Sequence, residues 1–125
     1  MAGTVTNTET TIYTVKKIVF DWLSGTGDDA GAASSASTNY FTGLIQRVVQ
    51  IPDAAATQPT AAYDVVVNDD DGVDVLHGLG ANLANDATTV KDYTDGLGAV
   101  VNSKLALAVT NAGDAKGGKT IIYLR

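Results

Sequence analysis

The sequence predicts an all-β domain, built as a single antiparallel β-sandwich or small barrel. Short apolar segments with a period of two recur along the chain, and no segment has a clear helical period. Such alternation gives a strand one buried face. The chain also has 13 Gly but a single Glu, Glu9. Glycine favours tight turns, whereas Glu favours helices. With 125 residues, the chain is long enough for one domain with its own core.

The N-terminal segment predicts a flexible arm over residues 1–16, ahead of an all-β domain over residues 17–125. The arm is rich in Thr and has few large apolar residues. Within this arm, residues 10–15 can form a short strand. We also expect the arm to add to a neighbouring subunit by strand pairing, in which case deletion of residues 2–15 weakens assembly.

Two strands and a loop follow the arm. Residues 17–23 (KIVFDWL) alternate and place Trp22, the only Trp, in the core. Residues 24–39 (SGTGDDAGAASSASTN) have almost nothing to bury, which favours a mobile loop over one that orders against a partner. Residues 40–52 (YFTGLIQRVVQIP) predict a longer strand that bends at Gly43.

The central segment, residues 61–76 (AAYDVVVNDDDGVDVL), predicts a β-hairpin with an acidic tip. Tyr63, Val65 and Val67 alternate with polar or smaller residues and form one buried face. Asp and Gly residues then supply a turn, and residues 73–76 resume as an apolar strand.

The C-terminal part predicts more short strands. Residues 86–94 could form one or two helical turns. Residues 97–101 and 104–110 predict a second hairpin, in which Leu, Leu and Val alternate with smaller or polar residues. Residues 111–119 form a Gly-rich turn, and residues 120–125 (TIIYLR) a final strand.

The charge and the absence of Cys exclude several classes of function. The net charge of −6 disfavours binding to nucleic acid, because that affinity comes from neutralising phosphates. Without Cys, there are no disulfides, thiolate metal sites or Cys nucleophiles. No signal peptide and no apolar membrane span is visible, so we expect a soluble protein that stays in the cytoplasm or assembles there.

Residues 113–120 (GDAKGGKT) match the phosphate-binding pattern G-x-x-x-x-G-K-[ST]. That chemistry requires a helix after the loop, with its N-terminus facing the phosphate. Only residues 121–125 follow, and they favour a strand. The segment therefore predicts a hairpin turn and no nucleotide site.

The acidic tip offers the one metal candidate, a calcium site formed by Asp69, Asp71 and Asp74, since calcium prefers carboxylate oxygens. The spacing does not fit an EF-hand loop, and a solvated turn is the simpler interpretation. His77 is the only His, so a catalytic triad or a paired-His zinc site would depend on it alone. We therefore predict no catalytic residues, no cofactor and no enzymatic activity.

Several segments together resemble small structural proteins of tailed bacteriophages. These are KIVFDWL, YFTGLIQRVVQIPD, YDVVVNDDDGVDVLHGLGAN, LGAVVNSKLALAVTNAG and IIYLR, all within residues 17–125. The resemblance implies a virion structural protein on the capsid surface, specifically a decoration protein that stabilises the outer shell. Its partners would be the major capsid protein or other virion proteins, and it would form a homo-oligomer, with a trimer favoured, without binding nucleic acid or membrane.

Two alternatives remain at this point. One is a head-fibre, neck or tail component with the same all-β composition. The other is a binding module in which residues 24–39 and 69–74 contact a protein or a carbohydrate. Carbohydrate sites use aromatic side chains for stacking, and the predicted loops offer only Tyr40 and Tyr93.

Overall fold

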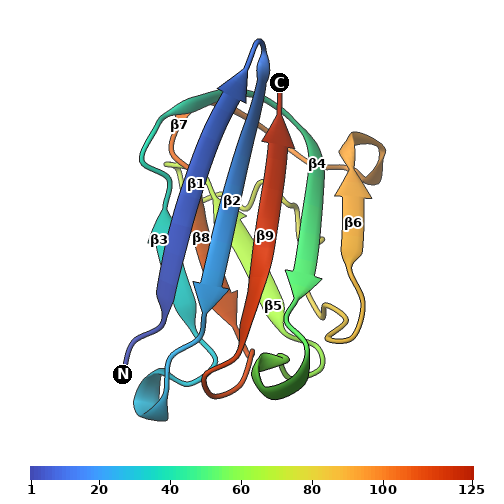
Figure 1. The fold of residues 1–125 in the computed structure, drawn as a ribbon. Coiled ribbons are helices and arrows are strands. Elements are labelled where there is room, and N and C mark those ends of the chain that lie inside the picture. Colours follow the sequence, from blue (N-terminus) through green and yellow to red (C-terminus); the bar gives the residue numbers. More distant parts are fainter.

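The computed structural model describes residues 1–125 and confirms the all-β class (Figure 1). Nine strands form two antiparallel sheets that face one another. The larger sheet is curled and has the order β1-β2-β9-β4-β6, and β7 also pairs with β4; the smaller sheet has the order β3-β8-β5. The strands are β1 (Thr4–Ile12), β2 (Val15–Leu23), β3 (Ala33–Ala36), β4 (Phe41–Pro52), β5 (Asp64–Asn68), β6 (Thr89–Asp92), β7 (Ala99–Ser103), β8 (Ala106–Thr110) and β9 (Gly117–Leu124).

The core lies between the sheets and follows the alternation in the sequence. The inward side chains of β2, β5 and β8 and their flanking residues are almost fully buried: Ile18, Phe20, Trp22, Tyr63, Val65, Val67, Leu105, Leu107 and Val109. Trp22 packs against Tyr63 of the other sheet, with ring centroids 5.6 Å apart. Burial of each such large apolar side chain stabilises the fold by roughly 1.5–3 kcal/mol. The predicted core position of Trp22 is confirmed.

The first sixteen residues are part of this domain, so the prediction of a flexible arm ending at residue 16 is wrong. β1 pairs with β2 along its whole length, from Thr4 opposite Leu23 to Ile12 opposite Val15. This pairing is within the chain's own sheet, not with a neighbouring subunit. Thr is β-branched and suits a strand even where there is little to bury.

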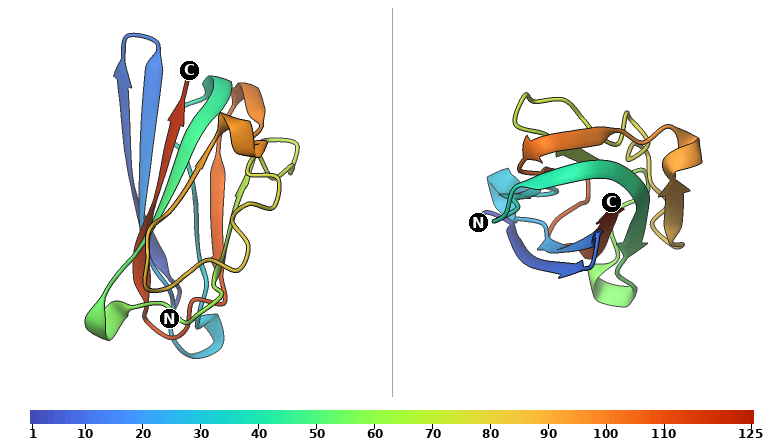
Figure 2. Two further views of the ribbon diagram at one scale, coloured as in Figure 1. Left: turned by 90° about the vertical axis from the view of Figure 1, so that its right-hand side faces the viewer. Right: turned by 90° about the horizontal axis from the view of Figure 1, so that it is seen from above.

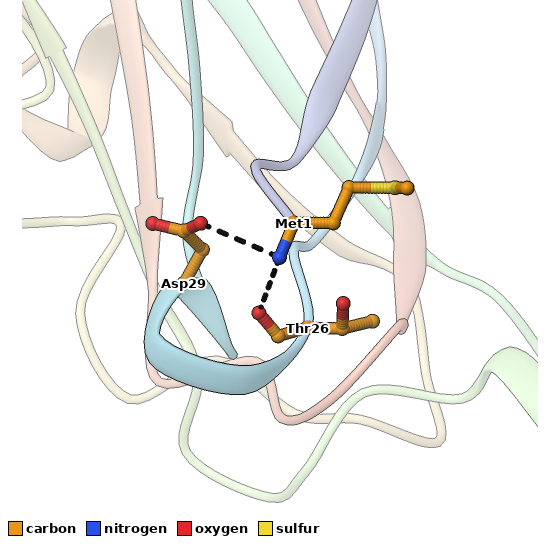
Figure 3. Close-up of polar contacts among 3 residues, drawn as sticks. All are labelled: Met1, Thr26 and Asp29. Carbon is orange, nitrogen blue, oxygen red and sulfur yellow. Dashed lines mark hydrogen bonds and ion pairs between the residues drawn. The ribbon is translucent and has the colours of Figure 1, made fainter.

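The N-terminus lies at the opposite end of β1 from the hairpin tip (Figure 1), and Figure 3 shows the contacts that hold it. The Met1 amine donates a hydrogen bond to the Thr26 carbonyl oxygen at 2.9 Å and lies 3.5 Å from the Asp29 carboxylate. This contact ties the start of β1 to the turn that follows β2.

Residues 24–39 are also ordered, contrary to the predicted mobile loop. They contain a 3-10 turn over Gly27–Asp29 and the strand β3, which pairs with β8. Side chains of β1 hold this segment. The Asn7 amide donates to the Ala36 carbonyl oxygen at 2.8 Å, and Glu9 accepts hydrogen bonds from the backbone N–H groups of Thr38 and Asn39. The segment is therefore held through its own backbone groups, which bond to side chains of β1 and to β8, and not by burial of large side chains of its own. The amino-acid composition of the segment does not reveal such contacts.

The two predicted hairpins are only partly correct. β5 is followed by the expected acidic turn, but residues 73–76 form no second strand, and only one bridge joins Asn68 to Asp74. β7 and β8 do not pair with each other, because β7 joins β4 in the larger sheet while β8 lies between β3 and β5. Residues 86–94 form β6 and the start of a single 3-10 turn over Tyr93–Asp95.

The predicted bend of β4 at Gly43 is confirmed. The register with β7 shifts between Phe41 and Gly43, and Gly43 has φ +150°. A Cβ atom at this position would lie 2.8 Å from the carbonyl carbon of Arg125. The first part of β4 can therefore curve over the end of β9, as the view from above shows (Figure 2).

Candidate interaction surface

The acidic turn uses its carboxylates to shape the backbone. Asp69 accepts hydrogen bonds from the N–H groups of Asp71 and Val73 at 2.9 and 3.0 Å. Asp74 accepts from the N–H groups of Leu76 at 3.0 Å and Gly78 at 2.9 Å. These bonds are typical of Asx turns. The structure does not bring Asp69, Asp71 and Asp74 together as a metal-binding group.

The phosphate-like pattern is divided between a connection and a strand. Lys119 and Thr120 belong to β9, and no helix follows them. The Thr120 hydroxyl is buried and donates to Gln50 instead of facing a ligand. Residues 111–116 lead from β8 in one sheet to β9 in the other. The segment is therefore a crossover between sheets rather than the predicted hairpin turn, and it forms no phosphate cradle.

His77 has a local structural contact. Its Nδ1 atom lies 2.6 Å from the Gly96 carbonyl oxygen, so the ring joins the segment after the acidic turn to the turn after β6. No acid–base pair involves it.

Three groups have shifted pKa values, and each shift has a local cause. Burial raises the pKa of Tyr63 to about 12. The Asn82 N–H and then the Asn111 side chain lower the pKa of Asp64 by hydrogen bonding to its carboxylate. Hydrogen bonds from Thr94, first from its hydroxyl, lower the pKa of Asp92. These shifts follow from packing and turn geometry and define no proton-transfer site.

The tip of the β1–β2 hairpin carries the most unusual residue on the surface. Tyr13 is 97% exposed and has φ +56°. A left-handed backbone conformation is uncommon for a bulky residue. The adjacent Ile12 is 63% exposed. The hairpin projects beyond the rest of the sandwich (Figure 2), so these side chains stand clear of the core.

A groove of about 340 Å³ lies beside the hairpin. It separates the hairpin from the connection between β3 and β4, and its lining residues are Glu9, Thr11, Lys16, Asn39, Tyr40 and Phe41. Tyr40 is 59% exposed, and the Lys104 ammonium lies 5.4 Å from its ring centroid. Lys16 donates to the Thr42 carbonyl oxygen at 3.0 Å and so links the hairpin to β4.

Two further exposed apolar residues lie at the same end of the sandwich. Leu44 exchanges backbone hydrogen bonds with Arg125 at the end of β9, and Val101 lies on β7, which pairs with the start of β4. We call the end formed by the following residues the hairpin-end surface: Ile12, Tyr13, Tyr40, Leu44 and Val101.

The acidic turn approaches this end from the smaller sheet. The Asp70 N–H donates to the Ser103 hydroxyl at 2.9 Å, and Ser103 pairs with Phe41 in the groove wall. One hydrogen bond and one strand pair therefore link the acidic turn to the wall of the groove, on the side of the smaller sheet. The sequence marked Tyr40 as a loop aromatic but gave no signal for the backbone conformation of Tyr13.

Comparison of the chain with known protein families, curated proteins and solved structures gives no match. The structure contains no helix with the length and apolar character needed to cross a bilayer.

Proposed function

We propose that this chain is a non-enzymatic structural protein of a tailed-bacteriophage virion, a decoration protein that docks on the outer capsid shell. Its partners are the major capsid protein or other virion proteins, and its copies self-associate. The observation that carries this proposal is the hairpin-end surface, where exposed apolar and aromatic residues gather at one end of the sandwich. Surface clusters of this kind mark interaction sites, and Tyr is enriched among residues that dominate binding energy.

The backbone at Tyr13 supports a binding role for this end. A bulky residue in the left-handed region costs roughly 1–3 kcal/mol, so it is expected where it serves a purpose other than folding. Tyr13 buries almost nothing within its own chain, since 97% of it is exposed. Its ring is therefore available to fill a pocket on a partner.

The resemblance of residues 17–125 to phage structural proteins supplies the class of partner. A rigid sandwich with one apolar end suits a part that attaches in many copies to a larger assembly. A head-fibre, neck or tail component would attach through the same surface. These alternatives therefore differ from a decoration protein only in where on the particle the chain binds.

A module that binds protein or carbohydrate is the second candidate, because Tyr40 borders a groove that also has polar walls. Aromatic rings beside polar groups suit sugar recognition. Two of the polar groups are already engaged, since Glu9 bonds to Thr38 and Asn39 and Lys16 bonds to Thr42. This reduces the hydrogen-bonding capacity left for a sugar.

Co-sedimentation with expanded capsid shells of the phage whose genome encodes the chain tests the proposal. We expect the wild-type chain to sediment with the shells and Tyr40→Ser to weaken that binding by about tenfold or more. Tyr93→Ser is the matched control, because Tyr93 is similarly exposed, at 57%, but lies in the turn after β6 and is not one of the residues of the hairpin-end surface.

Absence of binding to shells, or equal losses in the two Tyr variants, would contradict shell docking through this end. Binding to purified tails or necks but not to shells would favour the other virion positions. Binding to a glycan array with the same dependence on Tyr40 would favour the carbohydrate module.

A further inference from the structure

The outer face of the larger sheet has a pattern of side chains that the core does not explain. In β2, Ile18, Phe20 and Trp22 point inward, so the residues that alternate with them point outward. In order, these outward residues are Val15, Lys17, Val19, Asp21 and Leu23. Val15 is 38% and Leu23 43% exposed. The smaller sheet does not cover this face, which Figure 1 views directly, although Val49 on β4 is only 6% exposed.

The register extends this pattern from β2 to the adjacent strand β9 and then to β4. A central apolar row is flanked by one charged row on each side. The central row is Val19, Ile121 and Val49; the row nearer the hairpin tip is Lys17, Tyr123 and Arg47; and the row on the other side is Asp21, Lys119 and Ile51.

The charges on this face form no ion pair within the chain. The one ion pair of the structure joins the Met1 amine to Asp29, so neither Lys17 nor Asp21 is paired. The Lys17 ammonium and the Arg47 guanidinium instead lie 5.7 and 5.4 Å from the ring centroid of Tyr123. No carboxylate of the same chain neutralises Lys17 or Arg47, so both can pair with a carboxylate of a partner.

We propose that a second copy of this chain packs on the outer face of β2, β9 and β4, about a two-fold axis that runs along the central apolar row. Rotation about this axis exchanges the two flanking rows. Lys17 then faces Asp21 of the partner subunit, and Val15 faces Leu23 of the partner subunit. A two-fold interface must be self-complementary in this way, with each contact made twice.

An axis parallel to the strands and centred on β9, the middle strand of this face, fails on charge. It would place Lys17 against Arg47 of the partner subunit, and Lys119 against Lys119 of the partner subunit. Like charges brought together at an interface cost several kcal/mol. The axis across the strands is therefore favoured, and it keeps the two sheets within the aligned class of sheet packing.

This geometry has two consequences. The assembly is a dimer, in contrast to the trimer implied by the phage resemblance. The strands of the two copies run in opposite directions, so the two hairpin-end surfaces point away from each other. A dimer could therefore join two docking surfaces. The inference rests on the pattern of the sheet and does not require the proposed shell docking.

A charge-exchange experiment tests the interface by sedimentation equilibrium, from about 1 μM to about 1 mM protein. We expect the wild-type chain to dimerise. Lys17→Asp and Asp21→Lys each place like charges in both symmetric contacts, and each should weaken the dimer by about tenfold or more. An equimolar mixture of the two variants should dimerise again, because both contacts between positions 17 and 21 then join opposite charges. The double variant K17D/D21K should likewise recover the dimer.

Asp114→Lys is the control for the change in net charge, because Asp114 lies in the connection between β8 and β9 and not on this face. It should leave dimerisation unchanged, and circular dichroism should show that all variants are folded. A monomeric wild type, a trimer, or a mixture of the single variants that stays monomeric would overturn the proposal. A wild-type chain that dimerises but does not bind shells would contradict the proposed function and leave the dimer proposal standing.

Discussion

The hydroxyl of Thr120 donates a hydrogen bond to Oε1 of Gln50 at 2.6 Å, inside the sandwich. The two residues face one another across β9 and β4, and both are buried. The Gln50 Nε2 atom has no hydrogen-bond partner. This polar pair therefore depends on one bond, and it uses the hydroxyl that a phosphate-binding loop would turn toward magnesium.

Replacement of Thr120 by Val should destabilise the fold by about 1–3 kcal/mol, because it leaves the Gln50 carbonyl oxygen buried and unpaired. The double variant T120V/Q50M should recover most of the loss, since both polar partners are then removed at similar volume. Urea unfolding of the wild type, both single variants and the double variant measures these differences. Additive losses in the double variant would show that the pair is not coupled.

Replacement of Tyr13 by Gly should leave stability unchanged or raise it by up to about 1 kcal/mol, because Gly adopts positive φ without strain. The same variant should bind shells more weakly if the hairpin-end surface is the docking site. Thr14→Gly is the control, because Thr14 does not have positive φ. It should lower stability by about 0.5–1 kcal/mol through chain entropy. Thermal unfolding distinguishes the two, and a marked loss of stability in Tyr13→Gly would mean that the ring supports the fold.

Replacement of Gly43 by Ala should cost about 3 kcal/mol or more, because strain at positive φ and a backbone clash act together. The added Cβ would lie 2.8 Å from the Arg125 carbonyl carbon. Gly72→Ala separates the two causes, since Gly72 has φ +79° with no atom within 4 Å of the added Cβ. It should cost only about 1 kcal/mol. Denaturant unfolding measures both variants. If Gly43→Ala and Gly72→Ala lower the denaturant midpoint equally, the close approach of β4 to the end of β9 is contradicted.

Acid should weaken the contacts of Asp64. Its carboxylate accepts hydrogen bonds from the Asn82 N–H at 2.8 Å and from the Asn111 amide at 2.6 Å, which lower its pKa. A carboxyl group with a lowered pKa in the folded state contributes stability above its unfolded pKa, and that contribution is lost as the pH falls through the folded value.

The variant Asp64→Asn should therefore be less stable than the wild type near neutral pH, and the difference should shrink between about pH 5 and about pH 2. Thermal unfolding over this range is the measurement. Asp114→Asn should show no such convergence, because the Asp114 carboxylate takes part in no hydrogen bond or ion pair of the structure. A constant difference between wild type and D64N would contradict the contribution of the charge.

The sequence by itself determined which side chains of the main strands are buried. The alternation in β2, β5 and β8 predicted the inward faces, the core position of Trp22 and the all-β class. It also predicted the bend at Gly43. These features are local, because a strand with one buried face must have a period of two whatever its partners are.

Only the tertiary structure decided how the strands pair and what they expose. β7 and β8 are close in sequence but belong to different sheets, and residues 24–39 are ordered by contacts of Asn7 and Glu9 rather than by their own composition. The strained, exposed position of Tyr13 and the rows on the outer face likewise depend on register. The physical reason is that a strand's backbone can pair with many partners, and the choice among them comes from contacts between residues far apart in the chain.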